Sequence, residues 1–407
     1  MKIVHINTNS DKGGAAIAAK RHCKAMRAAG IDAKMIAYRG HSDDDTILYP
    51  FHHIPILQHI KDSINYRVST NIVNNSLWDL ECNDYDITGC KEVNEADIIY
   101  IHWVSGYLGT KSIISLLSLG KPVVWYMHDM APITGGCHHS FNCREYEKEC
   151  ANCPELRCCK FMAWKQLRKH MQWQLYDNLV GVAPSLWLTD CIKRSSVFRG
   201  HQVFCVPNVI DTRTFCPLNK KDVREKLNLP QSKKLVMFAS MPANDRYKGS
   251  NFLVKILEFL ATYSAYEFLV AGNYSPELFS YNTRSKIHSV GYISNEKQMA
   301  EVYNAADVFL ITSLAENFPN VILECMACGV PAVGFSTGGI KDQIYHKRNG
   351  WLTEPKQVND VIEGIFWVLE NPQYKELCQN AVNYVKLNCS YDKVWEIHQP
   401  IFSLISH

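Results

Sequence analysis

The chain alternates short apolar runs with segments of helical spacing, and few folds accommodate this pattern. The runs Asp97–His102 and Pro122–His128 are apolar almost throughout, as expected of parallel strands that are buried on both faces. Between them, Ser112–Leu119 has helical spacing and ends at Gly120. Repeated strand–helix units of this kind predict an α/β fold with a doubly wound parallel sheet.

The alternation begins a second time after Pro207–Asp211. Lys233–Ala239 and Val308–Ile311 have the pattern of buried strands, and Asn251–Tyr263 and Val321–Ala327 have that of helices. A chain of 407 residues suits two domains of roughly 150–250 residues each. The pattern therefore predicts two doubly wound, Rossmann-like domains.

The boundary between the two domains is expected at residues 209 and 210. The first domain then covers residues 1–209, and the second covers residues 210–389. A final helix over about 390–407 is expected to pack back on the first domain. Ligands of open α/β sheets bind at the carboxyl ends of the strands, so functional residues are expected in the loops that follow them.

The composition is that of a globular protein and argues against several other classes of protein. Apolar residues make up 47% of the chain and charged residues 20%. No run of 18 apolar residues occurs, so we expect no transmembrane helix, and the run in Met1–Asn7 is too short for a secretion signal. With 43 basic and 40 acidic residues, the net charge of +3 argues against nucleic-acid binding.

Cysteine is unusually frequent and unevenly placed. The chain has 16 cysteines and no export signal, which predicts a reducing, cytoplasmic location and favours metal ligation over disulfides. Cys137, Cys143, Cys150 and Cys153 lie in an insertion over about 134–160 with the spacing C-x5-C-x6-C-x2-C. Four thiolates at this spacing either hold a structural zinc or remain free or redox-sensitive thiols. A catalytic zinc is not expected, because four cysteines would leave no open position.

A basic and aromatic segment follows this insertion, over Arg157–Tyr176. It carries five lysines and arginines and no acidic residue, interleaved with Phe161, Trp164 and Trp173. Such a helix either meets an anionic membrane surface or packs its aromatic side chains inward. The first alternative predicts peripheral contact with the inner face of the cell membrane.

Two loops that follow expected strands carry features of phosphate sites. Gly13-Gly14-Ala15 follows the first strand and opens a helix, where glycine allows close backbone approach and the helix N-terminus favours an anion. Arg246 and Lys248, followed by Gly249, place two cations after Lys233–Ala239. The structural alternative is a tight turn for Gly13-Gly14-Ala15 and a solvated basic loop for Arg246 and Lys248.

A third loop carries two glutamates eight positions apart. Glu316 follows the strand Val308–Ile311, and Glu324 lies inside the next helix. Asn320 is expected to cap that helix and, with Val321, to leave backbone N–H groups for a diphosphate. Carboxylates at this place can hold sugar or ribose hydroxyl groups.

Several motifs in the same order belong to one known family. They comprise Gly13–Ala15, Val206–Asp211 with Phe215, Glu316–Glu324, Met326–Val333, Gly338–Asp342 and Asn349–Leu352. Together they resemble the retaining family-4 glycosyltransferases of the GT-B fold, also called glycosyl transferases group 1. The resemblance covers nearly the whole chain and implies two Rossmann-like domains that face each other across a cleft.

The resemblance also implies roles for particular residues. Lys248 matches the lysine that neutralises the donor diphosphate, Glu324 the glutamate that holds the ribose, and Glu316 the one beside the donor sugar. His128 matches the histidine near the reacting sugar, and Gly14 the N-terminal glycine turn.

The chain departs from the family at one place. Where the family has an arginine after the strand before the lysine, this chain has Phe238-Ala239-Ser240. Arg246 is the expected substitute for that cation.

The implied activity is transfer of a sugar from a UDP- or GDP-linked donor to a glycan or lipid-linked acceptor. The retaining, metal-independent hexosyltransferase would serve bacterial surface polysaccharide or capsule biosynthesis, with no cofactor for catalysis. Asp43–Asp45 is interpreted as solvated acidic surface and not as a metal-binding D-x-D motif. The alternatives are a nucleotide-sugar epimerase of the same fold and an inactive partner subunit. The donor base and sugar, the acceptor, the linkage and the oligomeric state do not follow from the sequence.

Overall fold

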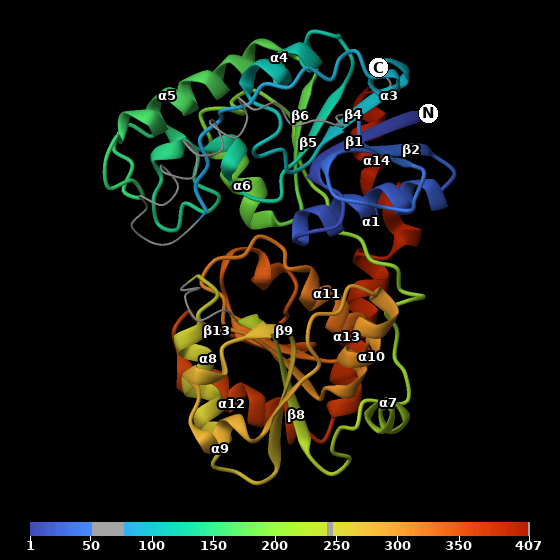
Figure 1. The fold of residues 1–407 in the computed structure, drawn as a ribbon, viewed down its shortest axis with the longest axis vertical. Helices are drawn as coiled ribbons and strands as arrows, with labels where there is room; N and C mark the ends of the chain where they lie inside the picture. Colours follow the sequence, from blue (N-terminus) through green and yellow to red (C-terminus); the bar gives the residue numbers. More distant parts are fainter. Residues whose placement is uncertain (51–76, 242–246, 406–407) are drawn as a thin grey trace. The chain divides into compact units, whose positions relative to one another are not determined.

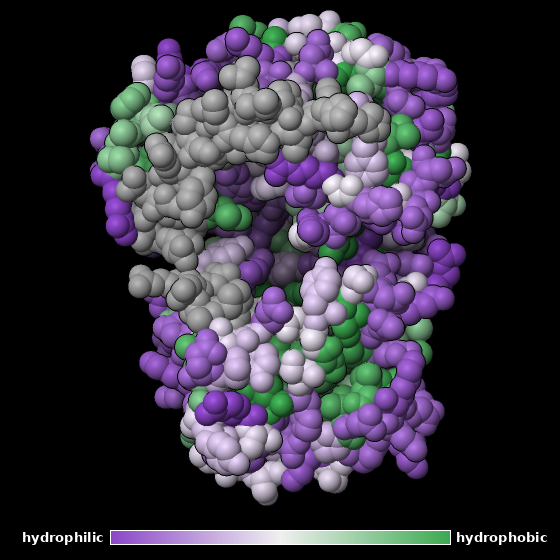
Figure 2. Space-filling model, in the orientation of Figure 1, coloured by the Kyte–Doolittle hydropathy of each residue, from purple (hydrophilic) through white to green (hydrophobic). Residues whose placement is uncertain are grey.

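A computed structural model describes residues 1–50, 77–241 and 247–405. The chain forms two compact units, Met1–Val209 with Val394–His407 and Ile210–Lys393 (Figure 1). Hydrophilic residues cover much of each unit on the face drawn in Figure 2. Within the described residues, no helix has the length and apolar character needed to cross a membrane.

The first unit is built on a parallel sheet of seven strands in the order β3-β2-β1-β4-β5-β6-β7. The strands are β1 Lys2–Asn9, β2 Asp32–Arg39, β3 Ile47–Leu48, β4 Ile98–Ile101, β5 Val123–Tyr126, β6 Leu179–Ala183 and β7 Val203–Cys205. The helices are α1 Gly14–Ala28, α3 Lys91–Glu95, α4 Thr110–Leu117, α5 Phe161–His170, α6 Leu186–Arg194 and α14 Val394–Ile405. The 3-10 turns in the described part of this unit are η1 Ala131–Ile133, η2 Glu145–Glu147 and η3 Met171–Leu175.

The two faces of this sheet differ in chemistry because side chains alternate along each strand. Val4 and Ile6 of β1 join the apolar core that includes α4 and α6. His5, between them, lies opposite Tyr100 of β4 and faces the other way. That second face is covered by α1 and α14, which pack on each other (Figure 1). The result is a buried layer of aromatic and imidazole rings between the sheet and these two helices.

The second unit has a parallel sheet of six strands in the order β10-β9-β8-β11-β12-β13. The strands are β8 Lys234–Met241, β9 Tyr266–Tyr274, β10 Ile287–Ser289, β11 Val308–Ile311, β12 Ala332–Phe335 and β13 Gly350–Thr353. The helices are α7 Lys220–Lys226, α8 Ser250–Leu260, α9 Tyr281–Arg284, α10 Glu296–Ala305, α11 Asn320–Ala327, α12 Val358–Leu369 and α13 Tyr374–Asn388. The 3-10 turns are η4 Pro276–Leu278, η5 Gly338–Asp342 and η6 Tyr391–Lys393.

The doubly wound sheets predicted from the sequence are confirmed in both units. Val236 and Phe238 of β8 pack toward α8 and α12, and Leu235 and Met237 pack toward α10, α11 and α13. The sequence analysis listed Asn349–Leu352 among the family motifs and did not predict the strand β13 that covers most of it. Gly350 lies so close to β12 that a Cβ there would stand 2.0 Å from the Ala332 carbonyl oxygen. Pairing with β12, and not the local sequence, makes this segment a strand.

Asp307 anchors α7 to the second sheet. Its carboxylate accepts hydrogen bonds from Arg224 and Lys220, each at 2.7 Å, and from the backbone N–H of Leu235 at 2.8 Å. Asp307 and Arg224 are both buried. Burial by itself raises the pKa of Asp307, but the two cations outweigh it and hold the pKa below its usual range. The pair is therefore desolvated and fully charged.

The substitution Asp307→Asn should destabilise the second unit by about 3–5 kcal/mol, because it leaves the buried Arg224 guanidinium without its counter-charge. Chemical denaturation followed by fluorescence would measure this change. Lys226→Ala is the matched control, since Lys226 forms an ion pair with Glu301 but is 63% exposed. The control substitution should lower the free energy of unfolding by no more than about 1 kcal/mol. Equal effects of the two substitutions would contradict the assignment.

Candidate functional site

The second unit brings Lys248 and Glu316 into direct contact. The Lys248 Nζ atom lies 2.6 Å from Glu316 Oε1, and Glu316 is the less exposed partner. The two residues are far apart in sequence and follow the neighbouring strands β8 and β11. Adjacent parallel strands end at the same edge of a sheet, which explains why these loops meet.

Gly249 allows the Lys248 segment to approach the end of β11. Its φ of 70° is left-handed, and a Cβ at this position would lie 2.0 Å from the Thr312 carbonyl oxygen. Thr312 Oγ1 donates to the Lys248 carbonyl oxygen at 3.2 Å, and Leu314 N–H donates to the Tyr247 carbonyl oxygen at 2.8 Å. These bonds fix the backbone of Lys248 beside Glu316.

Glu324 is held by a contact that the sequence did not indicate. It lies inside α11, is 7% exposed, and accepts a 2.7 Å hydrogen bond from the Tyr303 hydroxyl of α10. Burial and the neighbouring Glu324 carboxylate raise the pKa of Tyr303 well above its usual value, so Tyr303 remains a donor. The hydrogen bond from Tyr303 thereby fixes the orientation of the Glu324 carboxylate.

The expected helix cap at Asn320 is wrong. Asn320 is the first residue of α11, and the N-cap is Pro319, whose side chain cannot accept a hydrogen bond. The Pro319 carbonyl oxygen instead accepts a bond from the Gln343 side chain at 3.2 Å. Val321 follows in the first turn and is half-buried.

The other predicted site residues fall elsewhere. Arg246 lies outside the described residues. Gly14 begins α1 after Gly13, whose φ is 90°, and both belong to the first unit. His128 also belongs to the first unit, at the end of β5.

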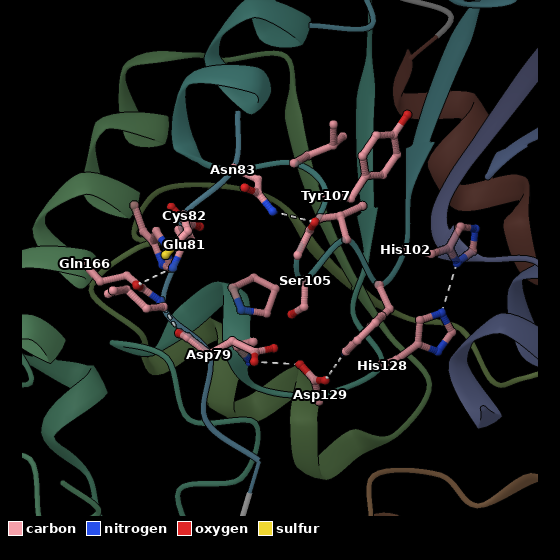
Figure 3. Close-up of a pocket in the computed structure, with 18 of the residues that line it drawn as sticks. Asp79, Glu81, Cys82, Asn83, His102, Ser105, Tyr107, His128, Asp129 and Gln166 are labelled. Atoms are coloured by element: carbon pink, nitrogen blue, oxygen red, sulfur yellow. Dashed lines mark hydrogen bonds and ion pairs between the residues drawn. The ribbon is translucent and has the colours of Figure 1, made fainter. Parts of the chain in front are cut away.

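A pocket in the first unit has an empty volume of about 600 Å³ and includes His128 in its wall (Figure 3). Eight of its lining residues carry a carboxylate, an imidazole or an indole. These residues are Asp79, Glu81, Asp129, His102, His128, His170, Trp103 and Trp125. Polar groups and flat apolar rings therefore converge on one concavity.

Asp129 is the centre of a buried charged network at this pocket. Its Oδ2 atom lies 2.5 Å from His138 Nδ1 and accepts a bond from Trp103 Nε1 at 2.8 Å, while His138 Nε2 lies 2.9 Å from Asp79. Burial lowers the pKa of His138, but the two carboxylates outweigh it and raise the pKa to about 10. The imidazolium of His138 thus ties the cysteine-rich insertion to the pocket wall.

A second carboxylate, Glu81, is satisfied in a similar way. It accepts bonds from the backbone and hydroxyl of Thr110 at 3.1 and 2.6 Å, and lies 2.7 Å from His170 Nε2. Burial raises the pKa of Glu81, but His170 and Thr110 outweigh it and lower the pKa. Glu81 therefore stays ionised at the pocket.

His128 is the outermost of three imidazoles in series. Its Nε2 atom lies 3.0 Å from His102 Nδ1, and His102 Nε2 lies 2.9 Å from His5 Nδ1. Burial lowers the pKa of His128 to about 4, so its imidazole is neutral at physiological pH. The sequence analysis singled out His128 but missed His102, although both follow adjacent strands. Both histidines stand at the end of an expected strand, and this shared position was the signal by which His102 could have been found.

The four cysteines named for zinc line one small pocket together with Glu145 and Glu155. Burial raises the pKa of Cys150 to about 12, which keeps this thiol neutral. Cys137, Cys143, Cys150 and Cys153 form no disulfide bond. Across the part of the chain that the structure describes, no group of three or more histidine, cysteine, aspartate or glutamate side chains could hold a metal ion. The structural zinc stays a prediction.

Comparison with known proteins identifies a family model that matches one segment of the chain, and several relatives. Residues 219–387 match the family model of glycosyl transferases group 1. An uncharacterized glycosyltransferase of Haemophilus influenzae is 28% identical over 132 residues, which cover 31% of this chain and 37% of that protein. WcaC of Escherichia coli, named as a colanic acid biosynthesis glycosyl transferase, is 22% identical over 284 residues, 65% of this chain and 66% of that protein. The chain thus spans between about a third and two thirds of the length of these relatives.

A solved structure shows the same architecture over the whole chain. HepE of Anabaena, crystallised in complex with UDP, is 17% identical and covers 100% of both chains with a TM-score of 0.64. Together with the two parallel sheets, this likeness confirms the GT-B fold class.

Proposed function

We propose that the protein is a retaining glycosyltransferase that uses a nucleotide-diphosphate sugar, from the premise that residues 219–387 match the family model of glycosyl transferases group 1. The observation that carries the proposal is the contact of Lys248 with Glu316 at the shared strand edge of the second unit. The Lys248 ammonium can bind a diphosphate, and the Glu316 carboxylate can bind sugar hydroxyl groups. The pair therefore suits a substrate in which a diphosphate is bonded to a sugar.

The chemistry assigns a separate task to each group. Breaking the sugar–phosphate bond leaves negative charge on the nucleotide diphosphate, which the Lys248 ammonium stabilises. The Glu316 carboxylate holds donor-sugar hydroxyl groups, and Glu324, oriented by Tyr303, holds the ribose. A protein cation on the diphosphate makes a divalent metal unnecessary for this step.

The donor is proposed to be UDP- or GDP-linked. The UDP complex of HepE supports the first of these bases. The acceptor is proposed to bind the pocket of the first unit, because ionised carboxylates accept bonds from sugar hydroxyl groups and indoles pack against sugar C–H faces. The name of WcaC supports a glycan or lipid-linked acceptor in surface polysaccharide biosynthesis.

Contact with a membrane surface through α5 is a further part of the proposal. Phe161 and Trp164 are 61% and 41% exposed, and five basic residues accompany them. Trp173, for which both membrane contact and inward packing were open from the sequence, is fully buried against Trp125 and His170. The membrane-facing aromatic residues are therefore proposed to be Phe161 and Trp164 alone.

A thermal-shift screen against UDP, GDP, ADP and CMP, without added metal, tests the donor site. One nucleoside diphosphate should raise the melting temperature by several degrees, because a ligand at 100 times its Kd adds about 2.7 kcal/mol to the folded state. CMP, which lacks a diphosphate, is the internal control. If no nucleotide stabilises the protein, the inactive partner subunit becomes the better interpretation.

A further inference from the structure

The three imidazoles of His5, His102 and His128 form a continuous hydrogen-bonded row behind the pocket. Each joins the next through one ring nitrogen, at 2.9 Å between His5 and His102 and at 3.0 Å between His102 and His128. His5 and His102 are at most 1% exposed, and His102 and His128 both contribute to the pocket wall (Figure 3). The row thus connects the interior of the first unit to its concave surface.

The strand register explains this alignment. His5 lies opposite Tyr100 in the pairing of β1 with β4, and the alternation of side chains brings His102 to the same face. The rings of His5 and His102 stack with centroids 5.2 Å apart, and those of His102 and His128 do likewise. The alignment of the three rings therefore depends on the pairing of β1 with β4 in the parallel sheet.

Both bonds in the row must point in the same direction. A neutral imidazole has one N–H and one bare nitrogen, so a ring that donates at one end accepts at the other. Burial lowers the pKa of His5 to about 3 and that of His102 well below its usual value, which keeps the row neutral. Two patterns remain, with the hydrogens directed either toward His128 or toward His5.

The inner end of the row distinguishes these patterns. Among the described residues, His5 Nε2 is buried and has no hydrogen-bond partner. If the hydrogens pointed inward, this atom would be an orphaned N–H, which folded proteins rarely contain. If they point outward, it is a bare ring nitrogen, and no buried N–H of the row is left without an acceptor.

We propose that His5 and His102 act as positioning residues that hold His128 in the tautomer with its hydrogen on Nδ1. His128 Nε2 is then an acceptor occupied by His102, and Nδ1 is a hydrogen-bond donor. The last step rests on the proposed function: a sugar or phosphate oxygen that reaches this nitrogen meets a neutral donor. His128 therefore orients and stabilises a substrate oxygen and does not act as a general base through Nδ1.

Nuclear magnetic resonance of the full-length protein with ¹⁵N-labelled histidine side chains tests the tautomer. The His128 resonances, assigned from a His128→Gln sample, should show a protonated Nδ1 and a bare Nε2 at pH 7.5. A protonated Nε2 on His128 would overturn the proposal. This measurement requires no turnover, so it stays decisive even if the protein is not a transferase.

Variants test whether His5 sets the direction. His5→Leu removes the first donor and should give a mixture of tautomers at His128, whereas His5→Asn retains an amide donor and should restore the single tautomer. His22→Leu is the matched control, because His22 is equally buried but its Nδ1 bonds to His398, outside the row. An unchanged His128 spectrum in a folded His5→Leu protein would overturn the role of His5.

The functional consequence is measured separately. With a donor identified by the nucleotide screen, His5→Leu should lower kcat about 3- to 10-fold and leave the KM for the donor unchanged, since one neutral hydrogen bond is weakened. His5→Asn should recover the rate. A tautomer shift without any change in kcat would remove the link to catalysis while leaving the tautomer assignment in place.

Discussion

Lowering the pH from 7 to 5 should unfold the first unit while the second remains folded. His5, His22, His102 and His398 are at most 1% exposed, and burial lowers the pKa of each below 6.5, to about 3 in His5 and His398. Between pH 6.5 and these lowered values the unfolded chain binds more protons than the folded unit. Stability contributed by the neutral imidazoles is therefore complete above pH 6.5 and is lost as the pH falls.

The size of this effect decides the outcome. Each histidine that stays neutral in the folded state costs about 1.4 kcal/mol of stability per pH unit below 6.5, so these four cost roughly 5–6 kcal/mol per pH unit. His128, whose pKa burial lowers to about 4, adds to this loss. A typical domain has only about 5–15 kcal/mol of stability in total. In the described part of the second unit no histidine is buried, so this unit has no comparable acid sensitivity.

Calorimetry between pH 7.5 and 5, with limited proteolysis and mass spectrometry to identify the unfolded segments, measures the prediction. The slope of stability against pH should correspond to at least four protons taken up near pH 5.5, and the first cleavages should fall in residues 1–209. Uptake of fewer than one proton, or unfolding of both units together at the same pH, would contradict it.

The second large effect is expected at the donor site. Lys248→Ala should weaken binding of the nucleoside diphosphate by about 10- to 100-fold, since one charged hydrogen bond contributes about 1.5–3 kcal/mol. Glu324→Ala should reduce turnover by at least about tenfold through loss of the ribose contact. Titration calorimetry and a transfer assay measure these two effects. Lys226→Ala, an exposed lysine of the same unit, is the control for general loss of positive charge.

Glu316→Gln separates binding from chemistry. Its carboxylate lies 2.6 Å from the Lys248 ammonium, so it competes with the diphosphate for that cation. The neutral amide should leave nucleotide affinity unchanged or increase it, while turnover falls because the donor sugar loses a charged partner. A loss of affinity as large as that of Lys248→Ala would place Glu316 on the nucleotide and contradict the assignment.

Local sequence determined most of the fold. The apolar run Val308–Ile311 appears in the structure as β11 with the same bounds, because burial on both faces of a parallel sheet demands such a run. The helical spacing of Val321–Ala327 appears in α11 with bounds that differ by one residue. The same reasoning indicated Lys248 and Glu316, since ligand sites lie after strands. It failed at β13, where pairing with β12 outweighs weak local preference.

Only the tertiary structure decided which side chains meet. No spacing rule relates Tyr303 to Glu324, or Asp79 to His138, because their contacts depend on how helices and loops pack. The row from His5 to His128 depends on the register of three strands, which a single sequence does not specify. The sequence by itself thus determined the sheets and the loops that carry the chemistry, and packing decided the partners that orient, charge or neutralise each group.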